Sequence, residues 1–172
     1  MEAVSSLRSN IAARVKAFLV LVLLWIMLMY PFALQDLYAG IVIAGLLVIL
    51  PLPGYRVYAE IGLAPKRLLY LLIYLVVLIR EIIRANIDVA FRVVKPVLPI
   101  RPGIVKVKTG LQSRLGRLVL ANSITLTPGT ITVEARGEYF YVHWIAVDAD
   151  DADTTTQKIV SQFEKYLEVI FG

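Results

Sequence analysis

Residues 120–130 read LANSITLTPGT, and they mark the sharpest change of local structure in the sequence. Apolar residues at helical spacing precede the run, and Pro128-Gly129 ends it. Proline fixes φ and glycine tolerates a positive φ, which is the pattern of the two central residues of a type II turn. The alternation Thr-Ile-Thr-Val resumes from Thr130. The stretch therefore predicts that a helix ends, a tight turn forms and a strand begins within about ten residues.

A small α+β domain is predicted around this turn, over residues 104–172. Alternating apolar and polar residues indicate strands with one buried face, and leucines at helical spacing indicate the helix before the turn. Arg136-Gly137-Glu138 has the length of a hairpin connection, with glycine for a positive φ. The predicted order is β-α-β-β-α, with strands at 104–109, 131–135 and 139–147 and helices at 111–119 and 154–171.

An acidic run, Asp148 to Asp153, precedes the last predicted helix. Its spacing lacks the glycine and the distal glutamate of an EF-hand loop, so we do not expect a metal site there. Asp153 is instead the expected N-cap, because a carboxylate at that position accepts from free backbone N–H groups and faces the positive end of the helix dipole. In the same way, the Thr125 and Thr127 hydroxyls are expected to satisfy backbone groups at a helix end.

Two apolar segments begin the chain, and they predict a membrane helical hairpin with helices at about 17–34 and 37–52, joined at Gln35-Asp36. Each is close to the minimum of about 17 residues for a transmembrane helix. The bulky end of the first segment lacks a signal-peptide cleavage pattern, so we expect it to be retained. Gly40 and Gly45 either allow a neighbouring helix to approach closely or are ordinary filler.

A long amphipathic helix is predicted at 66–94. Twelve apolar residues, Leu68–Ile79, open it, and charged residues then recur at helical spacing. A third membrane span fits this pattern, and so does a helix that lies at the membrane interface or is partly inserted beside partner subunits; the short apolar run favours the second arrangement. The charged residues either contact lipid phosphates or a partner subunit, or form a solvated face. They are Arg80, Glu81, Arg84, Asp88 and Arg92.

Pro96 to Gly103 is predicted to be a linker, which divides the chain into a membrane part at 1–95 and the α+β domain at 104–172. Lys and Arg number 15 against 5 Asp and Glu through Arg117, and 3 against 8 afterwards. Basic residues flanking apolar helices are typical of cytoplasmic ends. We therefore expect a multi-pass protein of the cell membrane, with the N-terminus and the C-terminal domain in the cytoplasm.

The composition argues against most kinds of metal site and catalytic site. The 172 residues include no cysteine and a single histidine, which excludes thiolate sites and histidine metal clusters. Nucleophile–base pairs, cofactor fingerprints and nucleic-acid motifs are not visible, so we expect no enzyme activity, cofactor, metal or nucleic-acid partner. A path for ions through the bilayer needs ionisable groups, and the two first predicted helices contain no charged residue. This chain is therefore not expected to carry ions alone.

The run around the predicted turn resembles that of the E subunit of Mrp-type multisubunit monovalent cation/proton antiporters. The resemblance rests on Thr125, Thr127, Pro128 and Gly129, on His143-Trp144 after the next strand, and on IREIIRAN at 79–86. Related subunits occur in membrane-bound hydrogenase and sulfur reductase complexes with antiporter-like modules. The resemblance implies a non-catalytic accessory subunit that moves no ions itself, with other membrane subunits and lipid as its partners and Na+ as the transported cation.

The residues leave a second hypothesis open. The chain would then be a stand-alone membrane-anchored binding domain that senses anionic lipid or a soluble ligand through its basic helix and the face of the sheet that carries His143. The presence or absence of co-purifying membrane subunits distinguishes the two hypotheses.

Overall fold

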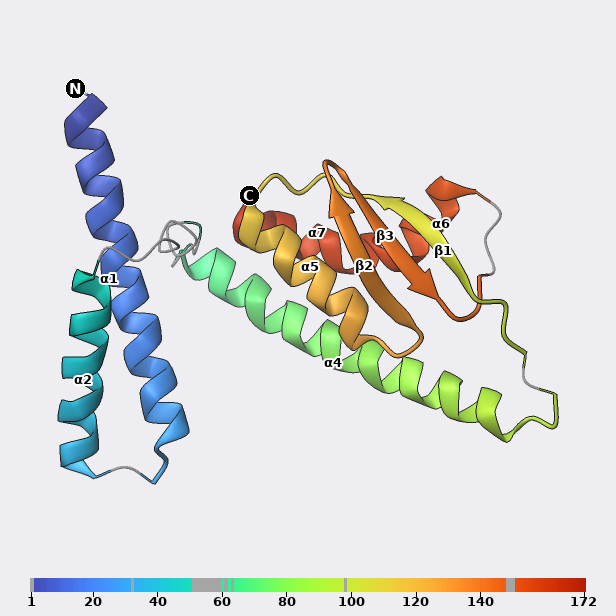
Figure 1. Ribbon diagram of the computed structural model, residues 1–172, viewed down its shortest axis with the longest axis horizontal. Helices are drawn as coiled ribbons and strands as arrows, with labels where there is room; N and C mark the ends of the chain where they lie inside the picture. The colour runs from blue at the N-terminus through green and yellow to red at the C-terminus, as the bar shows by residue number, and fades with distance from the viewer. Residues whose placement is uncertain are drawn as a thin grey trace. The chain divides into compact units, whose positions relative to one another are not determined.

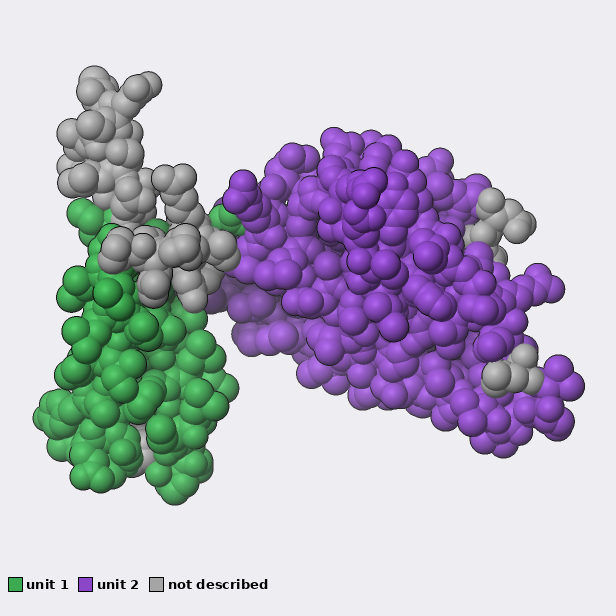
Figure 2. Space-filling model, viewed as in Figure 1, with its two compact units in different colours: residues 1–61 green, residues 62–172 purple. Residues whose placement is uncertain are grey.

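The computed structural model describes residues 2–31, 33–50, 60, 62, 64–97, 99–147 and 151–172, with side chains from Ile11 onward. The chain forms two compact units, residues 1–61 and residues 62–172 (Figure 2). The predicted end of the second helix at Leu52, residues 53–59 of the basic connection after it and the acidic residues Asp148 and Asp150 lie outside the described residues. Lys66 and Arg67, predicted in that connection, lie instead at the start of the helix Pro65–Val94.

The first unit is a pair of antiparallel helices, α1 (Glu2–Leu28) and α2 (Leu34–Ile49) (Figure 1). At one end, Arg14 Nη1 donates to the Val48 carbonyl oxygen at 3.2 Å. Near the connection, Trp25 Nε1 donates to the Asp36 carbonyl oxygen at 2.8 Å. Among the described residues, one helix is long and apolar enough to cross a membrane, over Ile11–Leu28, and the apolar helix Leu34–Ile49 is shorter.

The connection between these helices differs from the prediction. The first helix ends at Leu28, not at 34, and Gln35 and Asp36 lie in the first turn of α2. The cause is local capping, because the Asp36 carboxylate accepts from the Ala33 backbone N–H at 2.8 Å. A carboxylate there satisfies an N–H group that the helix start leaves unpaired.

Of the two glycines of α2, only Gly40 lies in the contact with α1. A Cβ added at Gly40 would overlap the Trp25 indole ring, whereas one at Gly45 would meet nothing within 4 Å. Ala44 is also buried. Gly40 therefore permits a close approach of the indole ring, and Gly45 has no such role within the described part of the chain.

The second unit contains an antiparallel sheet of β1 (Gly103–Lys108), β2 (Thr130–Arg136) and β3 (Tyr139–Trp144), in the order β1-β3-β2. Phe140 and Val142 of the central strand are buried, while Tyr139 at its start is exposed. Gly137 has φ +53°, which confirms the positive φ predicted for the hairpin connection.

Three helices cover one face of the sheet: α5 (Arg114–Leu126), α6 (Ala152–Ile159) and α7 (Ser161–Phe171) (Figure 1). Phe140, Phe163, Leu120 and Leu167 are almost fully buried between the layers. The sequence predicted a single helix at 154–171, but the structure has two, because the chain turns at Val160. The turn allows α6 to pack on β1 while α7 packs on α5.

The predicted N-cap Asp153 is wrong, and Asp151 occupies that position. Asp151 Oδ1 accepts from the Thr154 backbone N–H at 2.7 Å, and Asp151 Oδ2 accepts from the Thr154 hydroxyl at 2.7 Å. These two hydrogen bonds lower the pKa of the Asp151 carboxyl. The helix begins at Ala152, so Asp153 lies within its first turn.

The long helix α4 (Pro65–Val94) belongs to the second unit. It packs on α7, and Tyr74 joins the same hydrophobic core as Phe140 and Phe163. By packing, the chain thus divides near residue 61, before the helix that the sequence assigned to the membrane part. The predicted linker 96–103 is tied to the sheet at its end, because Arg101 N–H donates to the Ile145 carbonyl oxygen at 3.0 Å.

Threonine hydroxyls occupy both edges of the sheet. The Thr156 hydroxyl of α6 accepts from the Lys108 backbone N–H at 3.1 Å, on the outer side of β1. The Thr125 hydroxyl of α5 accepts from the Thr132 backbone N–H at 3.1 Å, on the outer side of β2. Because unpaired edge N–H groups promote pairing with other chains, these contacts reduce the tendency of the sheet to associate through its edges.

Candidate functional site

The turn predicted from LANSITLTPGT is present. The Thr130 backbone N–H donates to the Thr127 carbonyl oxygen at 3.2 Å, which closes a four-residue turn. Gly129 has φ +94°, which confirms the positive φ predicted for that position. The Ile145 N–H donates to the Gly129 carbonyl oxygen at 2.9 Å, so the turn is fixed to the end of β3.

The hydroxyls of this stretch satisfy backbone carbonyl groups, as the sequence predicted. Thr125 Oγ1 donates to the Ala121 carbonyl oxygen at 2.9 Å, and Thr127 Oγ1 donates to the Ser123 carbonyl oxygen at 2.8 Å. Thr130 Oγ1 donates to the Ile124 carbonyl oxygen at 2.6 Å. Ser123 and Ile124 lie in the last turn of α5, where carbonyl groups lack a partner further along the helix, so the Thr127 and Thr130 contacts complete the helix end.

A pocket of about 460 Å³ lies where this turn meets α4, the end of β3 and the α6–α7 pair. Charged side chains of α4 line one side, and residues of the turn line another. The lining residues are Glu81, Arg84, Ala85, Asp88, Ile124, Thr127, Pro128, Thr130, Trp144, Lys158, Ile159, Gln162 and Phe163. The pocket thus brings together three of the five predicted charged residues and three of the six residues of the resemblance motif.

The two ion pairs of α4 beside this pocket differ in length and in exposure. The Glu81 side chain is only 12% exposed, and its carboxylate lies 3.9 Å from Arg84 Nη1, whose side chain is 74% exposed. Because the Arg84 side of the pair is exposed and the separation is long, the pair contributes little to stability. Arg92 Nε donates to Asp88 Oδ2 at 2.6 Å, and Arg92 Nη1 donates to the Pro99 carbonyl oxygen at 3.1 Å. Arg92 therefore fixes the end of α4, whereas Arg84 is held, among the described residues, only by its long ion pair with Glu81.

Other predicted residues lie away from the pocket. Arg80 is exposed on α4, and Thr125 contacts the outer edge of β2. His143 is half-buried on the open face of the sheet, in register with Ile104 on one side and Ile131 on the other. Those isoleucines are exposed, and within the described residues no acidic or basic side chain forms an ion pair with His143.

Sequence reasoning missed the contact that joins α4 to the domain. Tyr74 is 3% exposed, and its hydroxyl is hydrogen-bonded to Ser123 Oγ. Ser123 Oγ donates to the Val119 carbonyl oxygen at 2.6 Å, so the Tyr74 hydroxyl is the donor to Ser123. Burial raises the pKa of the Tyr74 phenol, against the effect of the Ser123 hydrogen bond, and it keeps the phenol protonated as a donor. Tyr70 and Tyr74, one turn apart within an apolar run, were the available signal.

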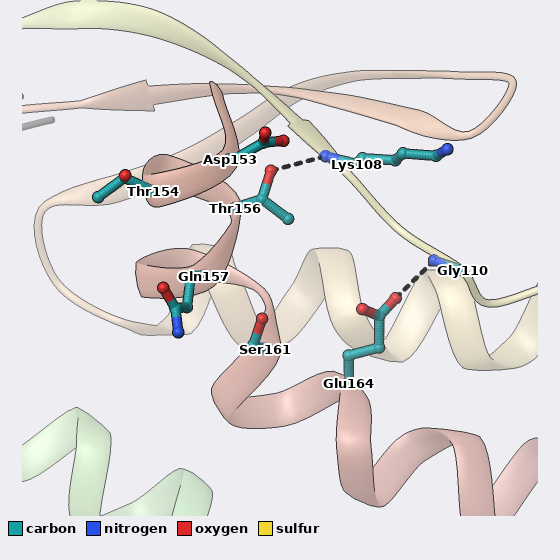
Figure 3. A pocket seen from close by; sticks show the side chains of 8 residues that line it. All are labelled: Lys108, Gly110, Asp153, Thr154, Thr156, Gln157, Ser161 and Glu164. Carbon is teal, nitrogen blue, oxygen red and sulfur yellow. Dashed lines mark hydrogen bonds between the residues drawn. The ribbon is translucent and has the colours of Figure 1, made fainter. Parts of the chain in front are cut away.

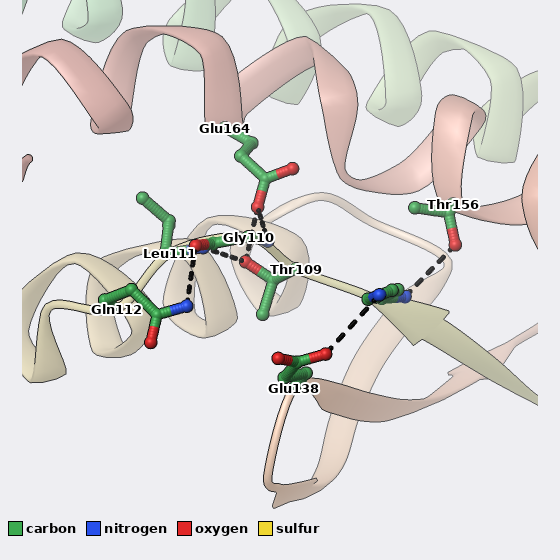
Figure 4. A network of polar contacts seen from close by, with 8 residues as sticks. Thr109, Gly110, Leu111, Gln112, Glu138, Thr156 and Glu164 are labelled. Carbon is green, nitrogen blue, oxygen red and sulfur yellow. Dashed lines mark hydrogen bonds and ion pairs between the residues drawn. The ribbon is translucent and has the colours of Figure 1, made fainter.

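A second pocket, of about 450 Å³, lies between the end of β1 and α6–α7, and polar residues line it (Figure 3). Several of its polar groups are used internally (Figure 4). Glu164 Oε1 accepts from the Gly110 N–H at 2.8 Å and from the Thr109 hydroxyl, and Lys108 Nζ lies 3.4 Å from Glu138 Oε2. These contacts hold the connection from β1 to α5, so this pocket has a structural role.

Comparisons with known proteins agree with the resemblance. The family described as Na+/H+ ion antiporter subunit (MNHE) matches residues 18–170. The E subunit of the Na+/H+ antiporter of Alkalihalophilus pseudofirmus is 28% identical over 86% of this chain and 90% of its own length. The E1 subunit of the Na+/H+ antiporter of Staphylococcus haemolyticus is 29% identical over 88% of this chain and 92% of its own length.

One solved structure is similar along most of the chain. It is a chain of the membrane-bound sulfane sulfur reductase, an archaeal respiratory membrane complex. The sequence identity is 39%, the TM-score is 0.80, and the match covers 93% of this chain and 99% of the other.

Proposed function

The chain belongs to the MNHE family of Na+/H+ ion antiporter subunits, and on that premise we propose that it is a non-catalytic accessory subunit of a multisubunit monovalent cation/proton antiporter module. The α1–α2 pair anchors it in the membrane, α4 lies at the membrane interface, and the α+β part of the second unit faces the cytoplasm. The observation that carries the proposal is the family match along residues 18–170, in a chain whose apolar segments 17–28 and 37–49 contain no charged residue.

The membrane helices support an accessory role. Within the span Ile11–Leu28 the charged residues are Arg14 and Lys16, both near its N-terminal end, and none follows from Ala17 to Leu28. Asp36 is the single charged residue of α2, where it caps the first turn. Transport of a cation or proton through the bilayer needs ionisable groups within it, and such groups are costly enough to mark function. Conduction therefore belongs to neighbouring subunits, and this chain supports them.

A respiratory assembly is the favoured setting for the module. The chain is 39% identical to the sulfur reductase chain over 93% of its length, against 28% and 29% for the two bacterial antiporter subunits. The proposal is an antiporter-like module within a membrane-bound sulfur reductase type of complex, with a separate Mrp-type antiporter as the second candidate.

The pocket beside Pro128 is proposed as a contact with a neighbouring subunit. In purification in mild detergent, we expect several membrane subunits to accompany the chain, and mass spectrometry identifies the assembly.

Glu81→Lys tests the contact at the pocket, because it places a like charge beside Arg84 and Lys158. We expect it to lower the yield of the co-purified subunits several-fold. Glu168→Lys, on the exposed side of α7, is the control and keeps the wild-type yield. Purification of the chain alone would favour the stand-alone binding domain.

The cytoplasmic placement has its own test, because the chain contains no cysteine. Gln157 is exposed on α6 and lies outside the pocket beside Pro128, so a single Gln157→Cys variant reacts with a membrane-impermeant thiol reagent only when that side of the membrane is accessible. In sealed right-side-out vesicles we expect no labelling, and in inverted vesicles we expect full labelling. Labelling of right-side-out vesicles would place the second unit outside the cell.

A further inference from the structure

The outward side of α4 is apolar along most of its length. Tyr70, Tyr74 and Leu78 face the core of the second unit, and aliphatic side chains at helical spacing occupy the opposite side, with exposures of 43–66%. We call them the aliphatic stripe, and they are Leu68, Leu72, Leu75, Val76, Ile79, Ile83 and Ile87. A soluble surface rarely exposes a continuous apolar patch of this extent, so the stripe marks an interaction surface.

The packing of α4 excludes a transmembrane orientation. Along its inner side, α4 packs on α7, and α7 exposes Lys165 and Glu168. If α4 crossed the bilayer, these charged side chains would enter the hydrocarbon region, where charges are costly. A helix that is covered by a polar domain on one side and is aliphatic on the other fits the plane of a membrane interface.

Basic residues beside the aliphatic stripe indicate that its binding partner is the surface of an anionic lipid bilayer. Arg80 and Arg84 are one helical turn apart and exposed, and Arg84 also lines the pocket beside Pro128. Lys66, at the start of α4, lies with its Nζ 6.0 Å from the Tyr70 ring centroid. Glu81 and Asp88 lie toward the pocket, so no acidic residue of α4 interrupts the stripe. This charge distribution is complementary to anionic lipid phosphates.

We propose that α4 lies flat on an anionic bilayer surface, with the aliphatic stripe inserted among the acyl chains and with Arg80 and Arg84 contacting lipid phosphates. The second unit is thereby attached to the membrane independently of α1 and α2. The proposal deepens the proposed function and rests on it for the membrane location. Of the five charged residues predicted as contacts, it assigns Arg80 and Arg84 to lipid and leaves Glu81 to a partner subunit. Asp88 and Arg92 contact each other at the end of α4.

Depth measurements test this placement. The chain has no cysteine, so Leu72→Cys, Ile79→Cys and Ile87→Cys each provide one site for an environment-sensitive fluorophore, with the exposed Gln157→Cys as control. The labelled chain is reconstituted in vesicles, both alone and in its co-purified complex. Nitroxide lipids, labelled near the headgroup or near the chain end, quench the fluorophore according to its depth.

We expect all three stripe positions to be quenched equally, more strongly by the shallow nitroxide than by the deep one, while position 157 is not quenched. A gradient of depth from 72 to 87 would indicate a spanning helix and overturn the proposal. The absence of quenching, or quenching of the isolated chain but not of the complex, would assign the stripe to a protein partner and would also overturn it. Each of these results leaves the accessory-subunit proposal intact, because co-purification measures that separately.

The arginines are tested with the double variant Arg80→Gln/Arg84→Gln, carrying the fluorophore at position 79. The readout is the ratio of quenching by anionic over zwitterionic nitroxide lipids. We expect the ratio to fall, by up to about fivefold for each arginine, which corresponds to about 1 kcal/mol per basic residue at an anionic surface. Arg136→Gln, on β2, should leave the ratio unchanged. An unchanged ratio in the double variant would remove the phosphate contacts from the proposal.

Discussion

Replacement of Gly129 by valine is expected to destabilise the second unit by about 2–5 kcal/mol. Gly129 has φ +94°, and a residue with a Cβ pays about 1–2 kcal/mol in the left-handed half of conformational space. A Cβ there would also lie 3.2 Å from both Ile145 Cδ1 and Cγ1. Overpacking of this kind costs about 1–3 kcal/mol. Thermal and denaturant unfolding of the purified chain in detergent, followed by circular dichroism, measures the loss.

Gly137→Val is the matched control for this variant. Gly137 has φ +53°, but a Cβ there would meet nothing within 4 Å, so only the backbone term of about 1–2 kcal/mol is expected. The difference between the two variants isolates the contact with Ile145. Because the turn also lines the pocket through Pro128, Gly129→Val should reduce co-purification as well. Wild-type stability in Gly129→Val would contradict the turn conformation.

Local patterns in the sequence were sufficient for the elements whose conformation is decided by neighbouring residues. Pro128-Gly129 determines its own turn because proline restricts φ and glycine allows φ to be positive. The strands predicted at 131–135 and 139–147 from alternation, with Gly137 between them, are present at 130–136 and 139–144, so the second ends three residues earlier than predicted. These features need no information about distant parts of the chain, and the structure agrees with them.

Helix ends and the division into units were not predictable to the same degree. The N-cap moved from Asp153 to Asp151 because both aspartates offer a carboxylate, and only the path of the chain selects one. The helix break at Val160 has neither proline nor glycine, and it arises because two helices must pack on different parts of the core. Capping preference limits such choices, but tertiary packing decides them.

The pocket beside Pro128 was also predictable only in part from the sequence. The sequence identified Glu81, Arg84 and Asp88 by helical spacing, and Pro128 and Trp144 by the resemblance motif. It gave no reason to expect these two groups to line one pocket, because α4 was assigned to the membrane part. Once Tyr74 inserts into the core of the second unit, the charged side of α4 necessarily faces the turn.

Replacement of Tyr74 by alanine is expected to cost about 3–5 kcal/mol, which is typical of removing a buried aromatic side chain. Tyr74 is 3% exposed and is the single buried residue of α4, which is described along its whole length. Its loss leaves a cavity in the hydrophobic core that Tyr74 shares with Leu120 and Phe163, and it leaves Ser123 without the phenol donor. We expect α4 to become accessible to protease near Lys66 and Arg67, and the unfolding midpoint to fall.

Tyr74→Phe separates packing from hydrogen bonding. The ring remains, and Ser123 Oγ keeps its bond to the Val119 carbonyl oxygen, so a loss of only about 1 kcal/mol is expected. If Tyr74→Ala unfolds like the wild type and α4 stays protected, the helix is held by something other than the core of the second unit. In that case the charged side of α4 need not face the turn, and neither the pocket nor the outward direction of the aliphatic stripe would follow. The alanine variant thus tests the packing on which both proposals depend.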